Sequence, residues 1–495
     1  MDGAVLGARP KVLSDIHPFI LTLVKYMSPP PPRLKRKYIP LEERRTTFKE
    51  PDYGYTREEA IEEAQRCMQC KKPPCVAACP AHVPVRDYVG AIAEGKFDEA
   101  FRLNREVLPI PCTLGRVCPA FCEAKCILGK KWEPVAIRNL KRAAGDYAEH
   151  WAPTVEGSID KKVAVIGAGP AGLTVAHDLA IKGYKVTVFD RLDRPGGTLV
   201  AGIPVFRLPR DVLGLDLQQI EDLGVEFLFN EELGKDFDLD SLNYEGFNAV
   251  FLGIGATVPK TLGITGEHLK GVASASTILL DLAFEREVDL PDRISIIGCG
   301  NVAIDIARSA IRLGKEATIL YRRTLKEAPA NDDEIEEAFE EGVDIKYLVA
   351  PIVVLGDEDE HCAAVECIKM ELGEPDDSGR RRPVPIEGST FRVPTDMVIP
   401  AISQSPDLDW LKMEDGLELT RWSTFWVDEE TGVTSREGVF AAGDDVLGPA
   451  TVVEAIAQAH VAADGIHRYL SPAAWERERH TEEETPTEWP PKPEE

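Results

Sequence analysis

The stretch KKVAVIGAGPAGLTVAHDLAIKGYKVTVFD, residues 161–190, decides the fold of the largest part of this chain. An apolar strand runs into a glycine-rich turn, and a helical pattern and a second strand follow. Gly167 permits the tight turn, Gly169 lets the backbone approach a pyrophosphate, and Gly172 lets the helix pack closely on the strand. Asp190 ends the second strand, where an acid binds the ribose of a dinucleotide. We therefore predict a dinucleotide-binding fold; a tight turn without a ligand is the alternative.

A second glycine-rich turn opens a helix in ISIIGCGNVAIDIARSA. Gly298, Gly300 and Ala303 occupy its three fingerprint positions. The strand that follows ends in Arg322 and Arg323, where a ribose-binding acid would otherwise stand. Because arginine pairs with a 2′-phosphate, this site favours NADP(H) over NAD(H). A solvated strand end is the alternative for the two arginines.

A third feature lies near the C-terminus, where EGVFAAGDDV places a strand before Gly443 and Asp444. An apolar-faced helix follows. An acid at a strand end beside a helix N-terminus suits contact with a second portion of the first dinucleotide. Gly-Asp is also common in turns, so an ordinary turn is the alternative.

Eight of the eleven cysteines precede the first glycine-rich turn. Their first run has a C-x2-C start, closely following third and fourth cysteines, and a proline after the fourth, as in two-cluster ferredoxins. The eight are Cys67, Cys70, Cys75, Cys79, Cys112, Cys118, Cys122 and Cys126. Two cubanes need eight ligands, so we predict two [4Fe–4S] clusters. Disulfides and zinc are the alternatives, although no convincing signal peptide indicates an oxidising compartment.

The composition limits the classes of function. The chain has 57 Lys and Arg against 84 Asp and Glu, a net charge of -27. This charge repels nucleic acid and anionic membrane surfaces, so neither is an expected partner. The longest N-terminal apolar stretch, Ile16 to Met27, is too short to span a bilayer, and we interpret it as a docking segment. The expected localisation is cytoplasmic.

Local patterns predict the surroundings of the cysteines. Thr56 caps a helix that ends at Cys67, and a second helix covers Val85 to Asn104. Pro29 to Pro32, followed by RLKRK, is typical of a stiff, charged linker. Beyond Leu470 the acidic, proline-rich sequence predicts a disordered tail.

From about Tyr38 to Leu470 the chain resembles the small (beta) subunit of NADPH-dependent glutamate synthase and its relatives. These include NADPH:ferredoxin oxidoreductase large subunits and the N-terminal half of dihydropyrimidine dehydrogenase. The match is carried by CMQCKKPPCVAACP, GRVCPAFCEAKC, GAGPAGL, RPGGTLVAGIPVFRLP, LGIGA, GCGNVA with YRRT, AISQSP and AAGD. The resemblance implies FAD on the first fold and NADPH on the second, with the NADPH domain inserted between two halves of the FAD domain.

The fold class expected from these features is α/β. It has two Rossmann-like dinucleotide-binding domains, one inserted in the other, preceded by a helical domain with two iron–sulfur clusters. The expected divisions are an N-terminal arm at 1–40, the helical double [4Fe–4S] domain at 41–150, the first part of the FAD domain at 151–283, the NADPH domain at 284–395, the second part of the FAD domain at 396–470 and an acidic tail at 471–495.

The resemblance also implies cofactor contacts beyond the fingerprint glycines. Gly196, Gly197 and Thr198 would approach the FAD, although an ordinary glycine loop is the alternative; Gly255 and Ala256 would mark the crossing between domains. The predicted cofactor-binding residues are Gly167, Gly169, Pro170, Ala171, Gly172, Asp190, Arg191, Gly196, Gly197, Thr198, Arg207, Gly255, Gly298, Gly300, Asn301, Val302, Ala303, Arg322, Arg323, Gly443, Asp444 and Thr451.

Glu334, Glu337 and Glu341 are interpreted as a solvated helix face, although the family places this segment near the nicotinamide cofactor. No general base is predicted, because hydride transfer is the cofactors' own reaction.

The chain departs from its relatives at the second cluster. There the family often has only three cysteines and a downstream Glu or Gln, and the matching position here is Lys141. An ammonium group has no lone pair for iron. We therefore expect Cys112 to replace the missing ligand; a buried spectator thiol is the alternative. The crossed ferredoxin pattern pairs Cys67, Cys70 and Cys75 with Cys126, and Cys79 with Cys112, Cys118 and Cys122.

These features predict an NADPH-oxidising subunit that passes electrons through FAD and two [4Fe–4S] clusters to a partner. A glutamate synthase large subunit is the leading candidate for that acceptor. Alternatives are an NADPH:ferredoxin oxidoreductase, including an electron-bifurcating one, and a sulfide or polysulfide reductase. A non-catalytic redox scaffold and a zinc-stabilised interaction module are the rivals from other classes.

Overall fold

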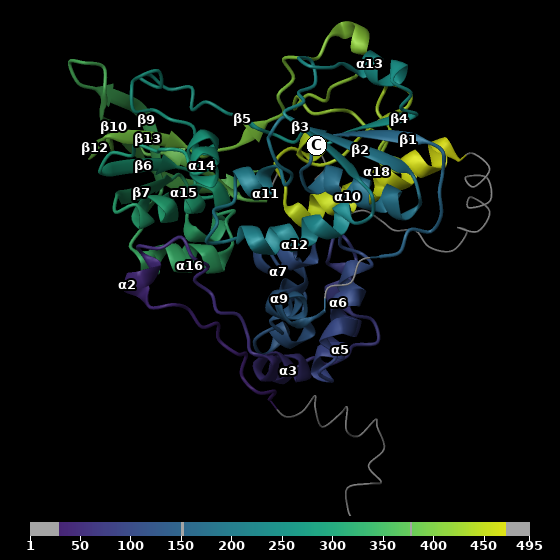
Figure 1. The fold of residues 1–495 in the computed structure, drawn as a ribbon. Coiled ribbons are helices and arrows are strands. Elements are labelled where there is room, and N and C mark those ends of the chain that lie inside the picture. The colour runs from purple at the N-terminus through teal and green to yellow at the C-terminus, as the bar shows by residue number, and fades with distance from the viewer. Residues whose placement is uncertain (1–28, 150–152, 377–378, 472–495) are drawn as a thin grey trace, which may run out of the picture.

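The computed structural model describes residues 29–149, 153–376 and 379–471. A helical domain lies beneath two α/β lobes, and the long helix α18, Val452–Leu470, runs along the lobe that contains the first glycine-rich turn (Figure 1). The predicted docking segment, Ile16 to Met27, and nearly all of the predicted tail lie outside the described residues.

The helical domain consists of short helices that carry the cysteines. The cap at Thr56 is present: its hydroxyl accepts the Glu59 N–H at 3.2 Å, and the Glu59 carboxylate accepts the Thr56 N–H at 2.9 Å. The single predicted helix from Val85 to Asn104 is wrong, because Gly95, with φ +77°, divides it into two. The elements are α2 Leu41–Arg44, α3 Arg57–Gln65, α4 Pro74–Ala77, α5 Val85–Ala93, α6 Phe97–Arg105, α7 Pro111–Val117, α8 Phe121–Ala124, η1 Ile127–Lys130 and α9 Ile137–Tyr147.

The first dinucleotide domain is built on a parallel sheet of order β15-β4-β1-β2-β3. Four of the five residues of β1 are buried, as expected for a strand covered on both faces. Helices α10 and α18 pack against each other beside it. Its elements are β1 Lys162–Ile166, α10 Pro170–Ile181, β2 Lys185–Asp190, α11 Thr198–Ala201, α12 Arg210–Glu221, β3 Glu226–Phe229, α13 Leu239–Tyr244, β4 Ala249–Leu252, η3 Met413–Asp415, β15 Val439–Ala441, α17 Asp444–Leu447 and α18.

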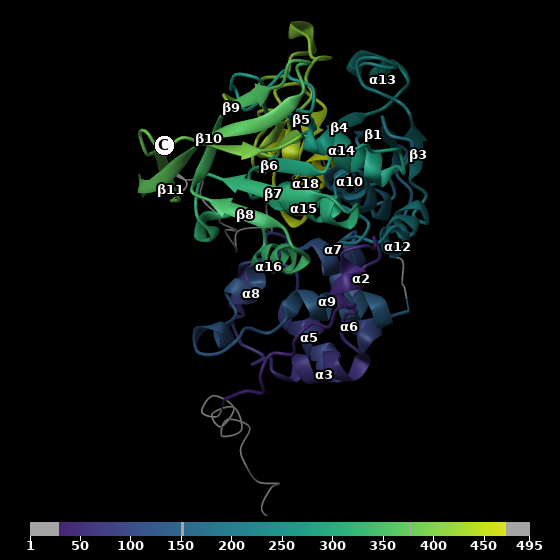
Figure 2. The same ribbon diagram turned by 90° about the vertical axis from the view of Figure 1, so that its left-hand side faces the viewer.

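The second dinucleotide domain repeats this plan with a parallel sheet of order β13-β6-β7-β8. An antiparallel sheet of β9 to β12, which the sequence analysis did not anticipate, extends from it (Figure 2). Its elements are α14 Ala275–Ala283, β6 Arg293–Ile297, α15 Asn301–Arg312, β7 Glu316–Tyr321, η2 Leu325–Glu327, α16 Asp332–Glu341, β8 Asp344–Tyr347, β9 Val349–Gly356, β10 Cys362–Pro375, β11 Arg381–Pro385, β12 Phe391–Pro394 and β13 Met397–Pro400.

The boundaries of the inserted domain differ from the predicted ones. Helix α14 was assigned to the first domain, but Ala275, Ile278 and Leu279 share a core with the second. Strand β13 was likewise assigned to the first domain, but it pairs with β6 of the second. The chain crosses between domains on two short paired strands, β5 Val258–Pro259 and β14 Gln404–Ser405.

The proline-rich segment before the helical domain is packed rather than free. The Pro31 carbonyl accepts the Arg66 guanidinium at 2.9 Å, and the Leu34 N–H donates to Glu63 at 2.9 Å. Tyr38 forms a bridge with Asp52. Residues 31–38 are therefore part of the folded structure, and the linker interpretation is corrected for them.

Candidate functional site: two dinucleotide sites and two groups of cysteines

The first glycine-rich turn forms a bare backbone cradle. A Cβ on Gly172 would lie 1.8 Å from the Gly167 carbonyl oxygen, so only glycine allows α10 to begin there. A Cβ on Gly197 would lie 2.7 Å from the Cα of Gly169, which brings the second glycine loop onto the first. Helix α10 has no side-chain cap, so its first N–H groups face this cradle. The arrangement fits a pyrophosphate.

Asp190 ends β2, as predicted, and its carboxylate anchors the loop. One oxygen accepts the Ala168 N–H at 2.6 Å and the other the Leu192 N–H at 2.8 Å. Burial raises the pKa of Asp190, although both backbone donors oppose this. Its neighbour Arg191 is exposed and donates to Thr257 at 2.9 Å.

The Gly-Asp turn near the C-terminus comes against the same helix. A Cβ on Gly443 would lie 3.0 Å from the Cβ of Ala171, and the Gly443 N–H donates to Gln458 at 2.7 Å. Burial, together with the nearby Glu454 carboxylate, raises the pKa of Asp444 to about 6, although the hydrogen bond from the Ala450 N–H opposes this shift. Thr451, also predicted, caps α18 together with Glu454.

The sequence analysis missed Asp445, the acid that follows this turn. Its carboxylate accepts the Ile254 N–H at 2.9 Å, beside the crossing at Gly255. Asp445 is fully buried, and burial raises its pKa well above its usual value. The second aspartate of the sequence Gly443-Asp444-Asp445 was the signal that could have identified it.

The second glycine-rich turn has the same geometry. A Cβ on Gly298 would lie 2.4 Å from the Ala401 carbonyl oxygen. Gly300 begins α15 without a side-chain cap, and Ala303 is fully buried under it. Val302 is 36% exposed at the mouth, and the Asn301 side chain accepts the Asn331 N–H at 3.2 Å. This cradle also fits a pyrophosphate.

The two arginines after β7 are not equivalent. Arg323 is buried, donates to Asp376 at 2.6 Å and to the Arg381 carbonyl at 2.9 Å, and so holds the antiparallel hairpin. Arg322 is exposed. Arg322 therefore fits the phosphate-binding role better than its neighbour.

Arg207, predicted to bind a cofactor, lies between the two dinucleotide domains. It forms ion pairs with Asp305 of α15 at 2.7 Å and with Glu334 of α16 at 3.1 Å. It is one member of an inter-domain ion network that comprises Arg36, Arg138, Arg207, Asp305, Arg308, Arg312, Asp333, Glu334, Glu337 and Glu341.

The glutamates of α16 belong to this network, so the prediction of a solvated helix face is wrong. Glu334, Glu337 and Glu341 are at most 8% exposed. Arg308 contacts all three, at 2.7 to 2.9 Å. Arg138 of the helical domain reaches Asp333 on the same helix at 2.6 Å, and Figure 2 shows α16 resting above the helical domain.

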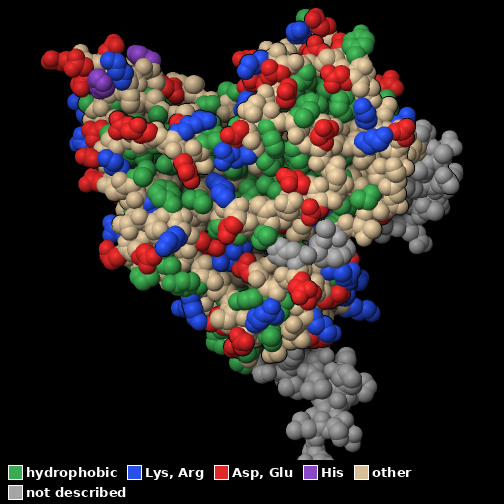
Figure 3. All heavy atoms as spheres, viewed as in Figure 1, with side chains coloured by type: hydrophobic (Ala, Val, Ile, Leu, Met, Phe, Trp, Pro, Cys, Tyr) green, Lys and Arg blue, Asp and Glu red, His purple; other side chains and the backbone are tan. Residues whose placement is uncertain are grey.

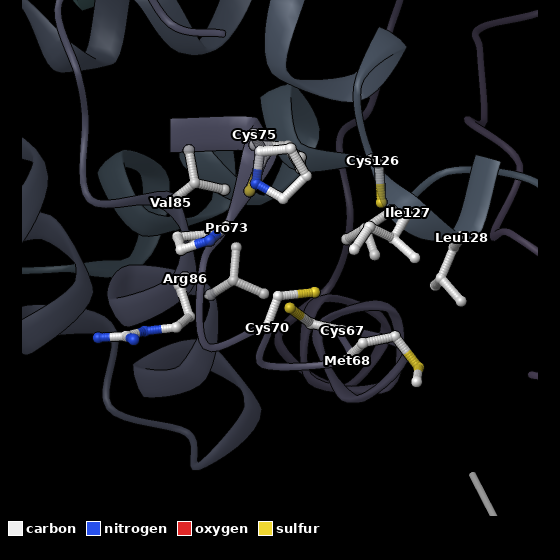
Figure 4. Close-up of a pocket in the computed structure, with 14 residues that line it drawn as sticks. Cys67, Met68, Cys70, Pro73, Cys75, Val85, Arg86, Cys126, Ile127 and Leu128 are labelled. Carbon is white, nitrogen blue, oxygen red and sulfur yellow. The ribbon is translucent and has the colours of Figure 1, made fainter. Parts of the chain in front are cut away.

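Four cysteines surround the first of two cavities in the helical domain. Cys67 follows α3, Cys70 lies in the next loop, Cys75 is in α4 and Cys126 precedes η1. Their sulfur atoms gather around one space, which is otherwise lined by apolar side chains and Arg86 (Figure 4). This is the set that the crossed pattern predicts for one cubane.

The second cavity is lined by Cys79, Cys118 and Cys122, with Lys141 of α9. Lys141 is 5% exposed. Burial alone would lower the pKa of Lys141, but the facing thiols of Cys118, Cys122 and Cys79 raise it above its usual value. Val453, in the first turn of α18, lines the same cavity, so this cavity adjoins the first dinucleotide domain.

Cys112, expected to supply the eighth ligand, is not among the residues that line the second cavity. A Cβ on Gly145 would lie 3.0 Å from its sulfur, so the thiol packs against α9. Asp216 of α12 accepts the N–H groups of Cys112 and Thr113 at 3.3 and 2.7 Å. The thiol is buried at the junction of two domains, and nothing in the sequence pattern marked Asp216 as the anchor of this segment.

The positions of the cysteines bear on the disulfide and zinc alternatives. All eleven cysteines are unpaired in the structure, which disfavours the disulfide alternative. Within the described residues, no three His, Cys, Asp or Glu side chains gather closely enough to hold a single metal ion. The four thiols that line the first cavity match the number of ligands that one cubane takes.

Comparison with known proteins agrees with this division. Residues 44–152 match a family described as dihydropyrimidine dehydrogenase domain II, 4Fe-4S cluster. Residues 161–459 match the pyridine nucleotide-disulphide oxidoreductase family.

Individual relatives fall into several groups. The NADPH-Fe(3+) oxidoreductase subunit beta of Geobacter sulfurreducens is 41% identical over 80% of this chain and 63% of its own length. The NADP(+)-dependent formate dehydrogenase subunit beta of Moorella thermoacetica is 41% identical over 80% of this chain and 60% of its own length. The chain thus spans less than two thirds of these two relatives. The glutamate synthase [NADPH] small chain of Escherichia coli is 35% identical over 87% of this chain and 96% of its own length.

The chain belongs to the family of the glutamate synthase small chain and related NADPH oxidoreductase subunits. Among solved structures, Mycobacterium tuberculosis FprA in complex with NADPH covers 64% of this chain and 86% of its own, with 19% identity and a TM-score of 0.54, and shows the fold alone. The predicted class, an NADPH-dependent oxidoreductase with FAD and iron–sulfur clusters, is confirmed. No helix among the described residues is long and apolar enough to cross a membrane.

Proposed function

We propose that this chain is the NADPH-oxidising electron-entry subunit of a larger redox system. The observation that carries this proposal is the position of the second cavity, whose lining includes both the thiols of the helical domain and Val453 of α18. The same helix is capped by Thr451 beside the Gly-Asp turn of the first cradle. Helix α18 thus lines the thiol cavity through Val453 and contacts the Gly-Asp turn through Gln458, which accepts the Gly443 N–H at 2.7 Å.

The chain's own residues hold and orient the cofactors. The first cradle, with Gly169, Gly197 and Asp190, would hold FAD, and the second, with Gly298 and Gly300, would hold NADPH beside Arg322. When bound, FAD accepts a hydride from NADPH and passes its electrons singly to the iron–sulfur clusters. The ion network fixes the second dinucleotide domain against both other domains and so sets the approach of the two cradles.

We place the electron exit at the first cavity. Cys70 there is half-buried, whereas Cys79, Cys118 and Cys122 at the second cavity are buried. The exposed residues Lys71 and Lys72 directly follow Cys70, and the two cysteine loops, 67–76 and 124–132, contain five exposed lysines, with Glu123 and Glu133 flanking the second loop. On the face that Figure 3 shows, charges of both signs are interspersed. An acidic acceptor protein suits this basic rim.

Two acceptors are candidates. The 96% coverage of the glutamate synthase small chain supports a glutamate synthase large subunit, which was the sequence-based expectation. The higher identity, 41%, to subunits of an iron(III) reductase and a formate dehydrogenase supports a partner of that kind as the second candidate. Purification of the tagged chain from its native cell, followed by identification of the co-eluting subunit, distinguishes them.

The electron-entry function itself is tested with the purified chain alone. NADPH added without oxygen should bleach the flavin and then produce the paramagnetic signals of reduced clusters. A preparation that contains FAD and iron but is not bleached by NADPH would favour the non-catalytic scaffold.

A further inference from the structure

The second cavity offers three thiols where a cubane has four corners. Cys79, Cys118 and Cys122 are joined there by Lys141, and the remaining lining is Pro80, Val83, Val85, Tyr88, Phe121 and Val453. Among these, Tyr88 alone carries another polar side-chain atom, and its hydroxyl already donates to the Ile137 carbonyl at 3.1 Å. Lys141 is therefore the side chain that faces the fourth corner.

The surroundings of Lys141 keep it in this position. It lies near the centre of α9, one turn after Arg138, which donates to the Cys118 carbonyl at 3.3 Å and to Asp333 of α16 at 2.6 Å. The helix is thus tied both to the loop that carries a thiol and to the second dinucleotide domain. A shift of α9 that withdrew Lys141 would break both contacts.

Cys112 is equally fixed outside the cavity. Its backbone is anchored by Asp216, and its sulfur packs on Gly145, one turn further along α9 than Lys141. For Cys112 to reach the cavity, the start of α7 would have to leave α12. The chain therefore offers no fourth thiolate at this site among its described residues.

We propose that the second cluster of this chain is held by three cysteine thiolates and that its fourth iron, opposite Lys141, has no protein thiolate and is exchangeable. Lys141 lies where the fourth ligand would be. Its positive charge offsets part of the negative charge of a thiolate-bound cluster that is buried beside the flavin domain. The first cluster, with four thiolates, holds its iron more firmly. This inference rests on the iron–sulfur part of the proposed function and not on NADPH oxidation or on any acceptor.

Mild oxidation of the second cluster should release the exchangeable iron. Removal of one electron from a [4Fe–4S]2+ cluster by ferricyanide gives [4Fe–4S]3+, and loss of Fe2+ leaves [3Fe–4S]+. The charges agree on both sides, and ferricyanide is the oxidant. Only the cluster that lacks a fourth protein ligand is expected to react in this way under mild oxidation.

The test uses the full chain, purified and reconstituted without oxygen, at roughly eight iron atoms per chain. It is treated with one equivalent of ferricyanide and examined by EPR and iron analysis. The wild-type chain and Cys112→Ser should both lose one iron per chain and develop the signal of a three-iron cluster. Lys141→Glu, which supplies a carboxylate in place of the ammonium, should keep its iron and show little of this signal.

Lys141→Met is the matched control, because it removes the charge without adding a ligand. It should still form the three-iron signal, with a lower midpoint potential for the second cluster than in the wild type. A wild-type chain that keeps all its iron and shows no three-iron signal would overturn this inference alone. A Cys112→Ser chain that fails to assemble one of the two clusters at reconstitution would also overturn this inference. A wild-type chain that binds no iron would overturn both this inference and the proposed function.

Discussion

Arg207 of the first dinucleotide domain donates to both carboxylate oxygens of Asp305 in the second, at 2.9 and 2.7 Å. Both side chains are buried. Because Arg207 also contacts Glu334, this single guanidinium joins the loop after the Gly-Gly turn to helices α15 and α16. The pair therefore links the two dinucleotide domains at a second place, in addition to the short paired strands β5 and β14.

Breaking this pair on one side should be costly. Asp305→Ala leaves Arg207 buried with one fewer partner, and we expect a loss of about 3–5 kcal/mol in stability. Thermal unfolding of the FAD-loaded chain measures it. The double variant Arg207→Met, Asp305→Leu should recover much of the loss, because no uncompensated charge remains; equal instability of the single and double variants would contradict this account. Asp193→Ala, which removes an exposed pair with Arg194, is the control and should change stability by about 0–1 kcal/mol.

The sequence predicted the parts of this molecule whose patterns are local. Both glycine-rich turns, the strand end at Asp190 and the helix cap at Thr56 lie where the spacing placed them, because each depends on residues a few positions apart. The ion network could not be predicted in this way. Glu334, Glu337 and Glu341 have the spacing of a solvated helix face, and only the arrival of Arg308 from a different helix makes them a buried cluster.

The cysteines show the same limit. The crossed ferredoxin pattern predicted the four thiols that gather around the first cavity, but Cys112 was assigned by counting ligands. Its exclusion depends on Asp216, more than a hundred residues away, which fixes the start of α7. The boundaries of the inserted domain were displaced for a similar reason, since the pairing of β13 with β6 is a long-range contact.

Gly197→Ala should abolish FAD binding. Gly197 has φ +52°, and a Cβ there would lie 2.7 Å from the Cα of Gly169, so the two loops must separate. The ratio of FAD to protein after purification measures the effect. Gly214→Ala is the matched control, because a Cβ there meets nothing within 4 Å in the middle of α12. Normal FAD content in Gly197→Ala would contradict the assignment of this cradle.

Arg322→Ala should reduce the preference for NADPH over NADH. Loss of a charge-assisted contact to a phosphate is worth about 1.5–3 kcal/mol, so KM for NADPH should rise about 10- to 100-fold while KM for NADH changes little. Steady-state reduction of a small dye measures both. Arg323→Ala should instead destabilise the hairpin through loss of Asp376, with a smaller change in the ratio of the two KM values. The reverse result would assign the phosphate to Arg323.

Asp444 predicts a pH dependence of the flavin-free chain. Burial raises its pKa from 3.8 to about 6, so the folded chain binds this proton more tightly than the unfolded chain does. The stability that protonated Asp444 contributes to the folded chain is therefore fully present below pH 4 and is lost as the pH rises through about 6. The loss is roughly 2–3 kcal/mol. Comparison of unfolding midpoints at acidic and neutral pH for the wild type and Asp444→Asn isolates it, because the variant should lack this part of the pH dependence.

The basic rim of the first cavity predicts how the acceptor docks. Lys71→Glu with Lys72→Glu places two negative charges beside Cys70, and an acidic acceptor should then bind more weakly, mainly through a slower association rate. The acceptor reduction rate at low ionic strength should fall, and its decrease with added salt, expected in the wild type, should disappear or reverse. NADPH-driven bleaching of the flavin and reduction of a small uncharged dye should be unchanged, since neither uses the rim.

The control of equal charge is Lys161→Glu with Lys162→Glu, which changes two adjacent exposed lysines at the start of β1. If this control slows acceptor reduction as much as the rim variant does, the effect is one of net charge, and the exit does not lie at the first cavity.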